Sequence, residues 1–189
     1  EDPTGDDNGP GGYVYPTDAV YTKGSFDLTG LSLDVKGKKA NVDVSVNANL
    51  EDPWGMDVGF AVQMAFVFID NAEGGYTDAL PGLNVKFSEE DAWDKVIILS
   101  PQTSARVRQE CEAKAGAMTD AIIVPSRTTG RGRTITGSLK AEDLGEGDPT
   151  TWGYQVVMQS NEGFPADMDL LTRKVNEYEG QHRFGGGTD

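Results

Sequence analysis

Two early segments of the chain alternate between apolar and polar residues. From Phe26 to Val35 the apolar positions mostly alternate with polar ones, with an interruption at Gly30. From Val42 to Leu50 the alternation is regular, and a glycine and two lysines separate the two segments. A period of two is typical of half-buried strands. The pattern therefore predicts two strands paired as an antiparallel hairpin, with an irregularity at Gly30.

A third segment, Phe60 to Ile69, is apolar for most of its length and shows no alternation. Such a run is typical of a central strand that is covered on both faces. Further along the chain, short apolar runs between turn residues predict additional strands. These runs lie at 84–87, 96–99, 122–124, 134–139 and 154–158.

Residues 104–118 are the best helix candidate in the chain. The segment is rich in Ala, Arg, Gln, Glu and Lys and begins shortly after Pro101, a combination that favours a helix. Within it, Cys111 is expected to be a small buried residue. The sequence AEDLG at 141–145 predicts a single helical turn.

The composition agrees with a protein made of strands and turns. Hydrophobic residues make up 37% of the chain and glycines number 24, which favours many short strands over long helices. We find no internal repeat and no linker. We therefore expect an all-β protein that forms one domain over 1–189, with residues 1–18 as an acidic leader, rich in glycine and proline, that packs on it.

The charge of the chain limits its partners. Lys and Arg total 16 against 31 Asp and Glu, so the formal net charge is −15. Nucleic acid and anionic membrane surfaces would be repelled. No stretch approaches the roughly 18 apolar residues of a membrane span, and the acidic start at Glu1 is unlike a basic signal-peptide region. We expect a soluble, mature chain with no nucleic acid partner and no membrane insertion.

Several carboxylates predict a calcium site. The leader contains five acidic residues, four glycines and three prolines in its 18 residues and would be floppy unless something tied it down. Calcium accepts six to eight oxygen ligands, including backbone carbonyls. The loop does not follow the EF-hand spacing. The alternative is a solvated acidic loop, and the proposed ligands are Asp2, Asp6, Asp7, Asp27 and Asp70.

Aromatic side chains provide candidate platforms for a sugar ring. The C–H face of a pyranose packs on an aromatic ring, while carboxylates and amides bind its hydroxyls. Trp93 and Trp152 each precede an apolar segment and are expected to be buried instead. Trp54 follows Pro53 in a turn and is the better exposed tryptophan. The candidate ligand-binding residues are Trp54, Tyr76, Tyr13 and Tyr178.

The sequence offers little for catalysis. His182 is the sole histidine, so neither a Ser-His-Asp triad nor a zinc site with two histidines is supported. A carboxylate pair for glycoside hydrolysis could exist among so many acids, but their number says nothing about a pair at the required separation. We therefore expect an accessory binding or structural module rather than an enzyme.

Haem b is an alternative ligand. Methionine together with histidine can hold haem iron, and Met64 or Met158 with His182 is the available combination. A methionine on an apolar strand is also ordinary core filler. The absence of a C-x-x-C-H motif excludes covalent c-type attachment.

Three arginines, Arg127, Arg131 and Arg133, predict a small basic loop in an otherwise acidic chain. Such a loop could dock on an acidic patch of another copy and give head-to-tail assembly. The alternative is an exposed loop that merely balances charge. A self-assembling surface or filament subunit is therefore a second functional hypothesis, and an electron-transfer domain with haem b is a third.

A series of uncommon glycine and aspartate motifs runs along the chain. In order they are DPTGDDNGPGGYVYPTDAVYTKGSFDLTG at 2–30, DPWG at 52–55, FIDNAEGGYTDALPG at 68–82, DPTTWGYQVVMQSNEGF at 148–164 and HRFGGGTD at 182–189. Together they resemble the C-terminal module of glucodextranases and related pullulanases. The similarity covers nearly the whole chain. The same motifs in the same order are more specific than any one of them.

The resemblance implies a fold and a function. The fold would be an antiparallel β-sandwich of the DOMON, jelly-roll or immunoglobulin-like kind with one short helix, as in extracellular carbohydrate-binding and haem-binding modules. The function would be non-catalytic binding of a polysaccharide or cell-surface polymer, at the cell surface or outside the cell. Relatives continue past GGGTD, so we expect a strand there to be missing, clipped or supplied by a partner.

Overall fold

The first two alternating segments form the predicted hairpin. In the computed structural model, which describes residues 1–7, 13–83, 85–161 and 180–185, β1 (Leu28–Lys36) pairs antiparallel with β2 (Lys39–Val46). The register shifts between Leu28 and Gly30, which confirms the predicted irregularity. Gly37 closes the turn with a φ of 61°, a conformation that glycine adopts without steric cost.

Two more strands complete this sheet, in the order β1-β2-β7-β6. β7 (Thr134–Lys140) was predicted and pairs with β2, whereas β6 (Arg127–Arg131) was not predicted. The prediction of a basic loop is therefore wrong for Arg127 and Arg131, which lie at the two ends of a strand. The sequence RTTGR contains no apolar residue, so its strand pairing left no hydrophobic pattern to read.

The second sheet has the order β5-β4-β3-β8. β3 (Gln63–Asp70) pairs with β4 (Lys95–Leu99) on one side and β8 (Gly153–Ser160) on the other. Its first seven residues are buried, which confirms a central strand covered on both faces. β5 (Ile122–Ile123) is parallel to β4, the one departure from antiparallel pairing among the described strands.

A helical crossover explains the parallel pair. α1 (Ser104–Lys114) and the short 3-10 helix η1 (Gly116–Ala121) connect β4 to β5, and parallel strands need such a long connection. α1 begins at Thr103, whose hydroxyl accepts from the N–H of Arg106. The helix ends four residues before the predicted boundary because the chain tightens into η1. Cys111 is buried, as predicted.

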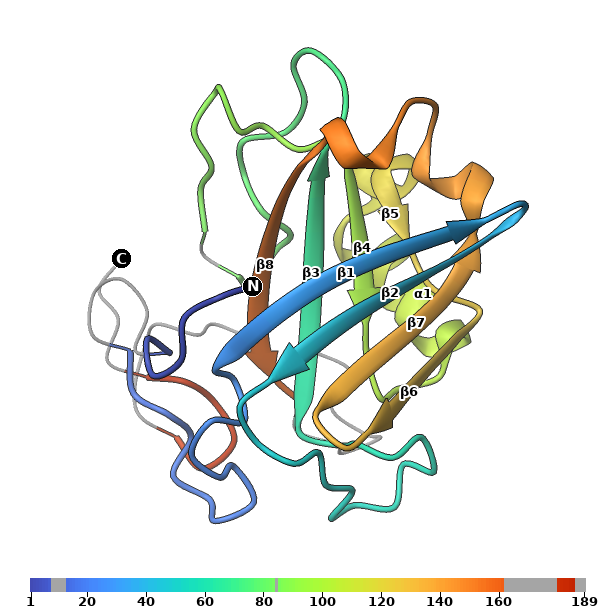
Figure 1. Cartoon of the computed structure of the whole chain (residues 1–189). Coiled ribbons are helices and arrows are strands. Elements are labelled where there is room, and N and C mark those ends of the chain that lie inside the picture. Colours follow the sequence, from blue (N-terminus) through green and yellow to red (C-terminus); the bar gives the residue numbers. More distant parts are fainter. Residues whose placement is uncertain (8–12, 84, 162–179, 186–189) are drawn as a thin grey trace.

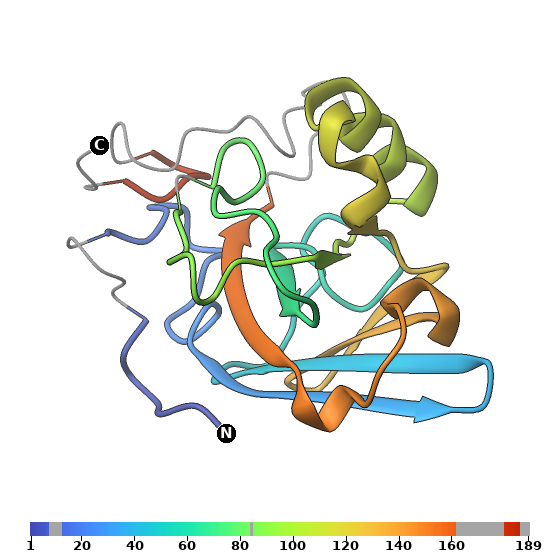
Figure 2. The same ribbon diagram turned by 90° about the horizontal axis from the view of Figure 1, so that it is seen from above.

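The second sheet is covered on its outer face by α1, η1 and the long loop between β3 and β4 (Figure 2). Phe66, Phe68 and Trp93 pack there with side chains of the helix. Residue 84 of the strand predicted at 84–87 lies outside the described residues, and 85–87 form no strand; Lys86 makes a single bridge to Asp78. The predicted helical turn is confirmed as η2 (Ala141–Leu144), and η3 (Pro149–Thr151) leads into β8.

The two sheets face each other across a shared core (Figure 1), which confirms the all-β sandwich with one short α-helix. Val44, Ile135 and Leu99 are fully buried between the sheets. Gly137 lies so close to the other sheet that a Cβ atom there would be 2.4 Å from Cδ2 of Leu99. Among the described residues, no helix is both long and apolar enough to cross a membrane.

Candidate functional site

A cavity lies along one side of the sandwich, between the edge strands of the two sheets. β1 is the edge strand of the first sheet and β8 that of the second. The cavity has a volume of about 810 Å³ and is lined by five consecutive residues of β8, 154–158. Consecutive side chains of a strand point to opposite faces, so this lining shows that the edge of β8 faces the cavity.

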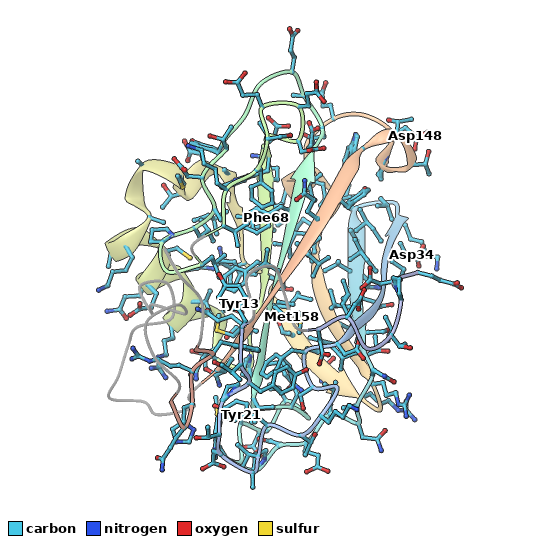
Figure 3. All side chains as sticks on the ribbon, turned by 90° about the vertical axis from the view of Figure 1, so that its left-hand side faces the viewer. Tyr13, Tyr21, Asp34, Phe68, Asp148 and Met158 are labelled. Atoms are coloured by element: carbon cyan, nitrogen blue, oxygen red, sulfur yellow. The ribbon has the colours of Figure 1, made fainter. Side chains whose placement is uncertain are left out.

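The walls of the cavity are mainly apolar and aromatic. Phe26 lies just before β1, and its ring packs edge-on against Phe184 at 4.7 Å between ring centroids. Tyr13 and Tyr154 add two phenol rings to the lining. Tyr13 and Met158, both labelled in Figure 3, line the same cavity. The cavity therefore combines flat apolar surfaces with hydroxyl groups.

The leader gives this cavity an acidic rim. Glu1, Asp2, Asp6 and Asp7 all contribute to its lining, whereas Lys86 is the one Lys or Arg among the described residues that line it. A rim with this charge disfavours anionic ligands and admits neutral or cationic ones.

Backbone hydrogen bonds hold the leader against the start of β1. The N–H of Asp2 donates to the carbonyl oxygen of Thr29 at 3.1 Å. The N–H of Gly5 donates to Oδ2 of Asp27 at 2.8 Å. These two hydrogen bonds attach the leader at the edge of the first sheet, next to a buried carboxylate.

That carboxylate, Asp27, is only partly satisfied. Its side chain is 2% exposed, and Oδ2 accepts from Gly5 and from Nδ2 of Asn47 at 3.0 Å. Oδ1 is buried and has no hydrogen-bond partner among the residues that the structure describes. A buried carboxylate oxygen without a partner is costly, so Asp27 is suited to binding a cation.

Asp7 lies close enough to Asp27 to interact with its charge. Burial raises the pKa of the Asp7 carboxyl, and the neighbouring charges of Asp27 and Asp6 raise it further, against a lowering effect of Lys23. The hydroxyl of Tyr15 donates to Oδ2 of Asp7. The leader therefore brings negative charge together without enough positive charge to balance it.

The described carboxylates of the leader do not form a complete coordination shell for a metal ion. Within 1–7, 13–83, 85–161 and 180–185, no group of three or more His, Cys, Asp or Glu side chains is arranged to hold a metal ion. Asp27 and Asp7 are the best placed of the predicted ligands, and Asp2 and Asp6 line the same cavity. Calcium could use them together with backbone carbonyls and water.

Asp70, the fifth predicted calcium ligand, lies elsewhere. It is the last residue of β3 and is not among the described residues that line the large cavity. Burial raises the pKa of Asp70, followed by the charges of Asp94 and Asp91. A smaller cavity of about 210 Å³ lies there. Asp70 therefore lines a different cavity from Asp2, Asp6 and Asp7.

The predicted aromatic platforms are also dispersed. Of the four, Tyr13 lines the large cavity. Trp54 is half-buried, and its ring packs edge-on against Tyr21. Tyr76 is 37% exposed and its ring lies 4.8 Å from that of Trp93, which is buried as predicted. Tyr178 lies outside the described residues.

Trp152 is half-buried rather than fully buried. It packs against the core between the sheets.

The structure does not bring the proposed methionine and histidine ligands of haem together in the cavity. Met158 lines the cavity, whereas Met64 is buried on the opposite face of the second sheet, under α1. The imidazole of His182 packs against the rings of Tyr21 and Trp54 and is not among the residues that line the cavity. The acidic rim would also repel the propionate groups of a haem.

Sequence reasoning missed most of the cavity. Phe26, Phe184 and Tyr154 come from three distant segments and meet only because β1 and β8 are both edge strands. The bridge between Val14 and Gly185 fixes the leader beside the last described segment. A glycine-rich motif at each end of the chain was the available signal, but it does not specify pairing.

Comparison with known families gives one match. A family model described as the C-terminal binding module, SLH-like, of glucodextranase matches residues 1–189. The match confirms the resemblance drawn from the glycine and aspartate motifs. A search of curated proteins found no match.

Proposed function

Since this chain belongs to the family of SLH-like C-terminal binding modules of glucodextranase, we propose that it is a non-catalytic module that binds polysaccharide. The cavity between β1 and β8 is the proposed binding site. The family is a binding module rather than the catalytic part of the enzyme, and the proposal extends this to an α-glucan ligand outside the cell or at its surface.

The observation that carries the proposal is the lining of the cavity. Its volume of about 810 Å³ is within the usual range for ligand sites. Tyr13 and Tyr154 present phenol rings, and Asp2 and Asp6 present carboxylates. Aromatic faces bind the C–H surface of a sugar while carboxylates accept from its hydroxyls. A neutral polysaccharide also avoids repulsion by the acidic rim.

A calcium ion at Asp27 and Asp7 is the second part of the proposal. The unpartnered Oδ1 of Asp27 supports it, as does the excess negative charge around Asp7. The ion would hold the leader on the first sheet and keep Tyr13 at the cavity. Calcium suits this region better than magnesium because it tolerates irregular geometry and carbonyl ligands.

Retention on immobilised dextran and other α-glucans, compared with a gel without polymer, tests the sugar-binding site. Tyr13→Ala removes an aromatic ring from the cavity, so we expect binding to weaken about tenfold, as for the loss of about 1.4 kcal/mol. Tyr76→Ala is the matched control, because Tyr76 is partly exposed but does not line the cavity. This control should bind as the unmodified chain does.

Two results would contradict the proposed site. If no α-glucan or cell-wall polymer is retained, polysaccharide binding itself fails. If Tyr76→Ala weakens binding and Tyr13→Ala does not, the sugar binds elsewhere. Thermal unfolding of both variants checks that neither effect comes from loss of the fold.

A further inference from the structure

A long segment of this acidic chain contains no acid. Between Asp120 and Glu142 there is neither Asp nor Glu, although the chain has 31 of them among 189 residues. The same segment contains four cationic residues, Arg127, Arg131, Arg133 and Lys140. It includes the whole of β6 and β7, so the charge of the fold changes sign at this side of the first sheet.

The register places the arginines beside short polar side chains. Arg127 pairs with Ser138, and Arg131 pairs with Thr134. Ser138 is in turn paired with Asn41 of β2. Directly paired residues share a face of the sheet. We call this surface the outer polar face, and its main members are Arg127, Arg131, Thr134, Thr136, Ser138 and Asn41.

The outer polar face is the side of the first sheet away from the core. Ile135 and Leu139 alternate with its members along β7 and are buried against the second sheet. In Figure 1 the first sheet lies in front, and no other described segment crosses this face. Figure 2 shows α1 on the far side of the second sheet. The face is therefore open to a large ligand.

Hydrogen bonds hold its short side chains in place. Thr136 donates from Oγ1 to Oδ1 of Asp43 at 2.6 Å. Ser138 donates from Oγ to Oδ1 of Asn41 at 2.8 Å. These bonds link β2 to β7 across the face, so a ligand would meet a surface whose side chains are already ordered.

The arginine side chains remain available for a ligand. Arg127, Arg131 and Arg133 are exposed, and none of them forms an ion pair with another described residue. Asp43 is the nearest acid in register, and it already accepts from Thr136.

The acidic leader is too far away to cancel this local charge. It packs at β1, three strand spacings from β6, which is about 14 Å. The Debye length is about 8 Å at physiological ionic strength. The outer polar face is therefore locally cationic even though the formal net charge is −15.

We propose that the outer polar face binds a polysaccharide that carries carboxylate groups. A guanidinium binds a carboxylate through two parallel hydrogen bonds. The hydroxyls and amide beside Arg127 and Arg131 can exchange hydrogen bonds with sugar hydroxyls. The ligand differs from that of the cavity, whose acidic rim disfavours an anionic chain, so the two surfaces are chemically distinct.

A second copy of the chain fits this face less well. Its acidic leader could contact the arginines, but stable protein interfaces usually have an apolar core. The outer polar face offers only hydroxyl, amide and charged side chains along β6 and β7. A polysaccharide needs no apolar core to form hydrogen bonds and charge contacts.

The test is binding to polygalacturonate, measured by affinity electrophoresis and calorimetry at low and at raised salt. The variant R127Q/R131Q should bind this polymer at least tenfold more weakly. A control of equal charge, K95Q/K114Q, changes lysines away from the outer polar face and should bind within about twofold of the unmodified chain. Neutral dextran, measured in parallel, should bind all three chains alike.

Several outcomes would overturn the proposal. It fails if polygalacturonate does not bind at low salt, or if both variants lose affinity equally, which would indicate non-specific charge. Sedimentation identifies the rival partner: association that R127Q/R131Q abolishes, without polymer binding, would assign the face to a second copy. Because dextran tests the cavity separately, failure of the glucan site remains distinguishable. Unchanged melting of R127Q/R131Q shows that the fold is intact.

Discussion

The two sheets of this sandwich have the same number of strands but very different surroundings. The sheet around β3 is buried on both faces, since it packs against the other sheet on one side and against α1 and the β3–β4 loop on the other. The sheet around β7 is buried on one face, and its outer residues are polar and half-exposed. One sheet thus forms the centre of the molecule, and the other keeps a free surface.

This difference separates stability from recognition. Side chains on a strand that is buried twice are constrained by close packing on each side. Side chains on the open face can vary in charge and hydrogen bonding at small cost in stability. The proposed cavity lies where the edge of one sheet meets the edge of the other, and the cationic surface lies on the open face. The following experiments test this division.

The largest effect is expected in the covered sheet. Phe66 is fully buried under α1, so Phe66→Ala should lower the free energy of unfolding by about 3–5 kcal/mol. On the open face, Thr136→Val preserves side-chain shape and removes one hydrogen bond to Asp43, which should cost about 1 kcal/mol. Urea unfolding of both variants measures the difference, and equal losses would break the comparison.

These two positions also show how much of the fold the sequence could predict. The apolar run through Phe66 predicted a strand buried on both faces because the covering elements leave a continuous hydrophobic pattern. The segment 134–139, which includes Thr136, was predicted only as a short strand, without its exposed face. β6 could not be found in this way, because RTTGR buries no apolar side chain and depends on pairing with β7.

The second effect is the stabilisation that calcium would give at Asp27, beside the cavity between β1 and β8. If calcium binds at Asp27, a concentration one hundred times its dissociation constant should raise the free energy of unfolding by about 2.7 kcal/mol. Thermal unfolding with added calcium and with a chelator measures this gain. Leader proteolysis should slow in parallel, because the ion would hold residues 1–7 on the first sheet. Identical melting and proteolysis in calcium and chelator would remove the ion from the proposal.

Asp27→Asn sharpens the same experiment. The amide oxygen of asparagine can replace Oδ2 and accept from Gly5 and Asn47, so the leader retains its anchor. The variant should no longer respond to calcium. In chelator it should unfold at the same temperature as the unmodified chain or higher, because it removes a buried charge whose Oδ1 has no partner. A large loss of stability in chelator would indicate that Asp27 has a purely structural role.

A smaller effect is expected where the sheets touch. Gly137 lies on the inner side of β7, and a Cβ there would meet Leu99 at 2.4 Å and Pro125 at 3.0 Å. Gly137→Ala should therefore cost about 1–3 kcal/mol through overpacking. The control is Ser138→Ala on the adjacent outer position, which should cost about 1 kcal/mol or less. A neutral Gly137→Ala would mean that the sheets can separate slightly without penalty.

The candidate site was less predictable than the fold. The density of acids near Asp7 pointed to a cation, but the sequence could not show that Asp70 lines a different cavity from Asp2, Asp6 and Asp7. The aromatic prediction recovered Tyr13 and missed Tyr154 and Phe184, because edge-strand positions are a property of the topology. Local composition predicts the kind of chemistry, whereas the strand order determines which residues share a site.

The smallest predicted effect is a pH dependence of stability that comes from Asp7 in the leader. Burial, and then the charges of Asp27 and Asp6, raise the pKa of the Asp7 carboxyl above its ordinary value. The folded state therefore binds this proton more tightly than the unfolded state. In chelator, this carboxyl's contribution to stability should be full below the unfolded pKa and should be lost as pH rises through the folded pKa.

Calcium should flatten this profile above the folded pKa, since the ion favours the ionised carboxylate. Melting temperatures measured across acid to neutral pH, with calcium and with chelator, give the comparison. Asp7→Asn removes the titration and should abolish the corresponding slope in chelator, whereas Asp34→Asn, on exposed β1 far from the leader, should leave it unchanged. If the melting temperature of Asp7→Asn still changes with pH in chelator, another carboxyl causes the pH dependence. Asp7 would then no longer support a calcium site at the leader.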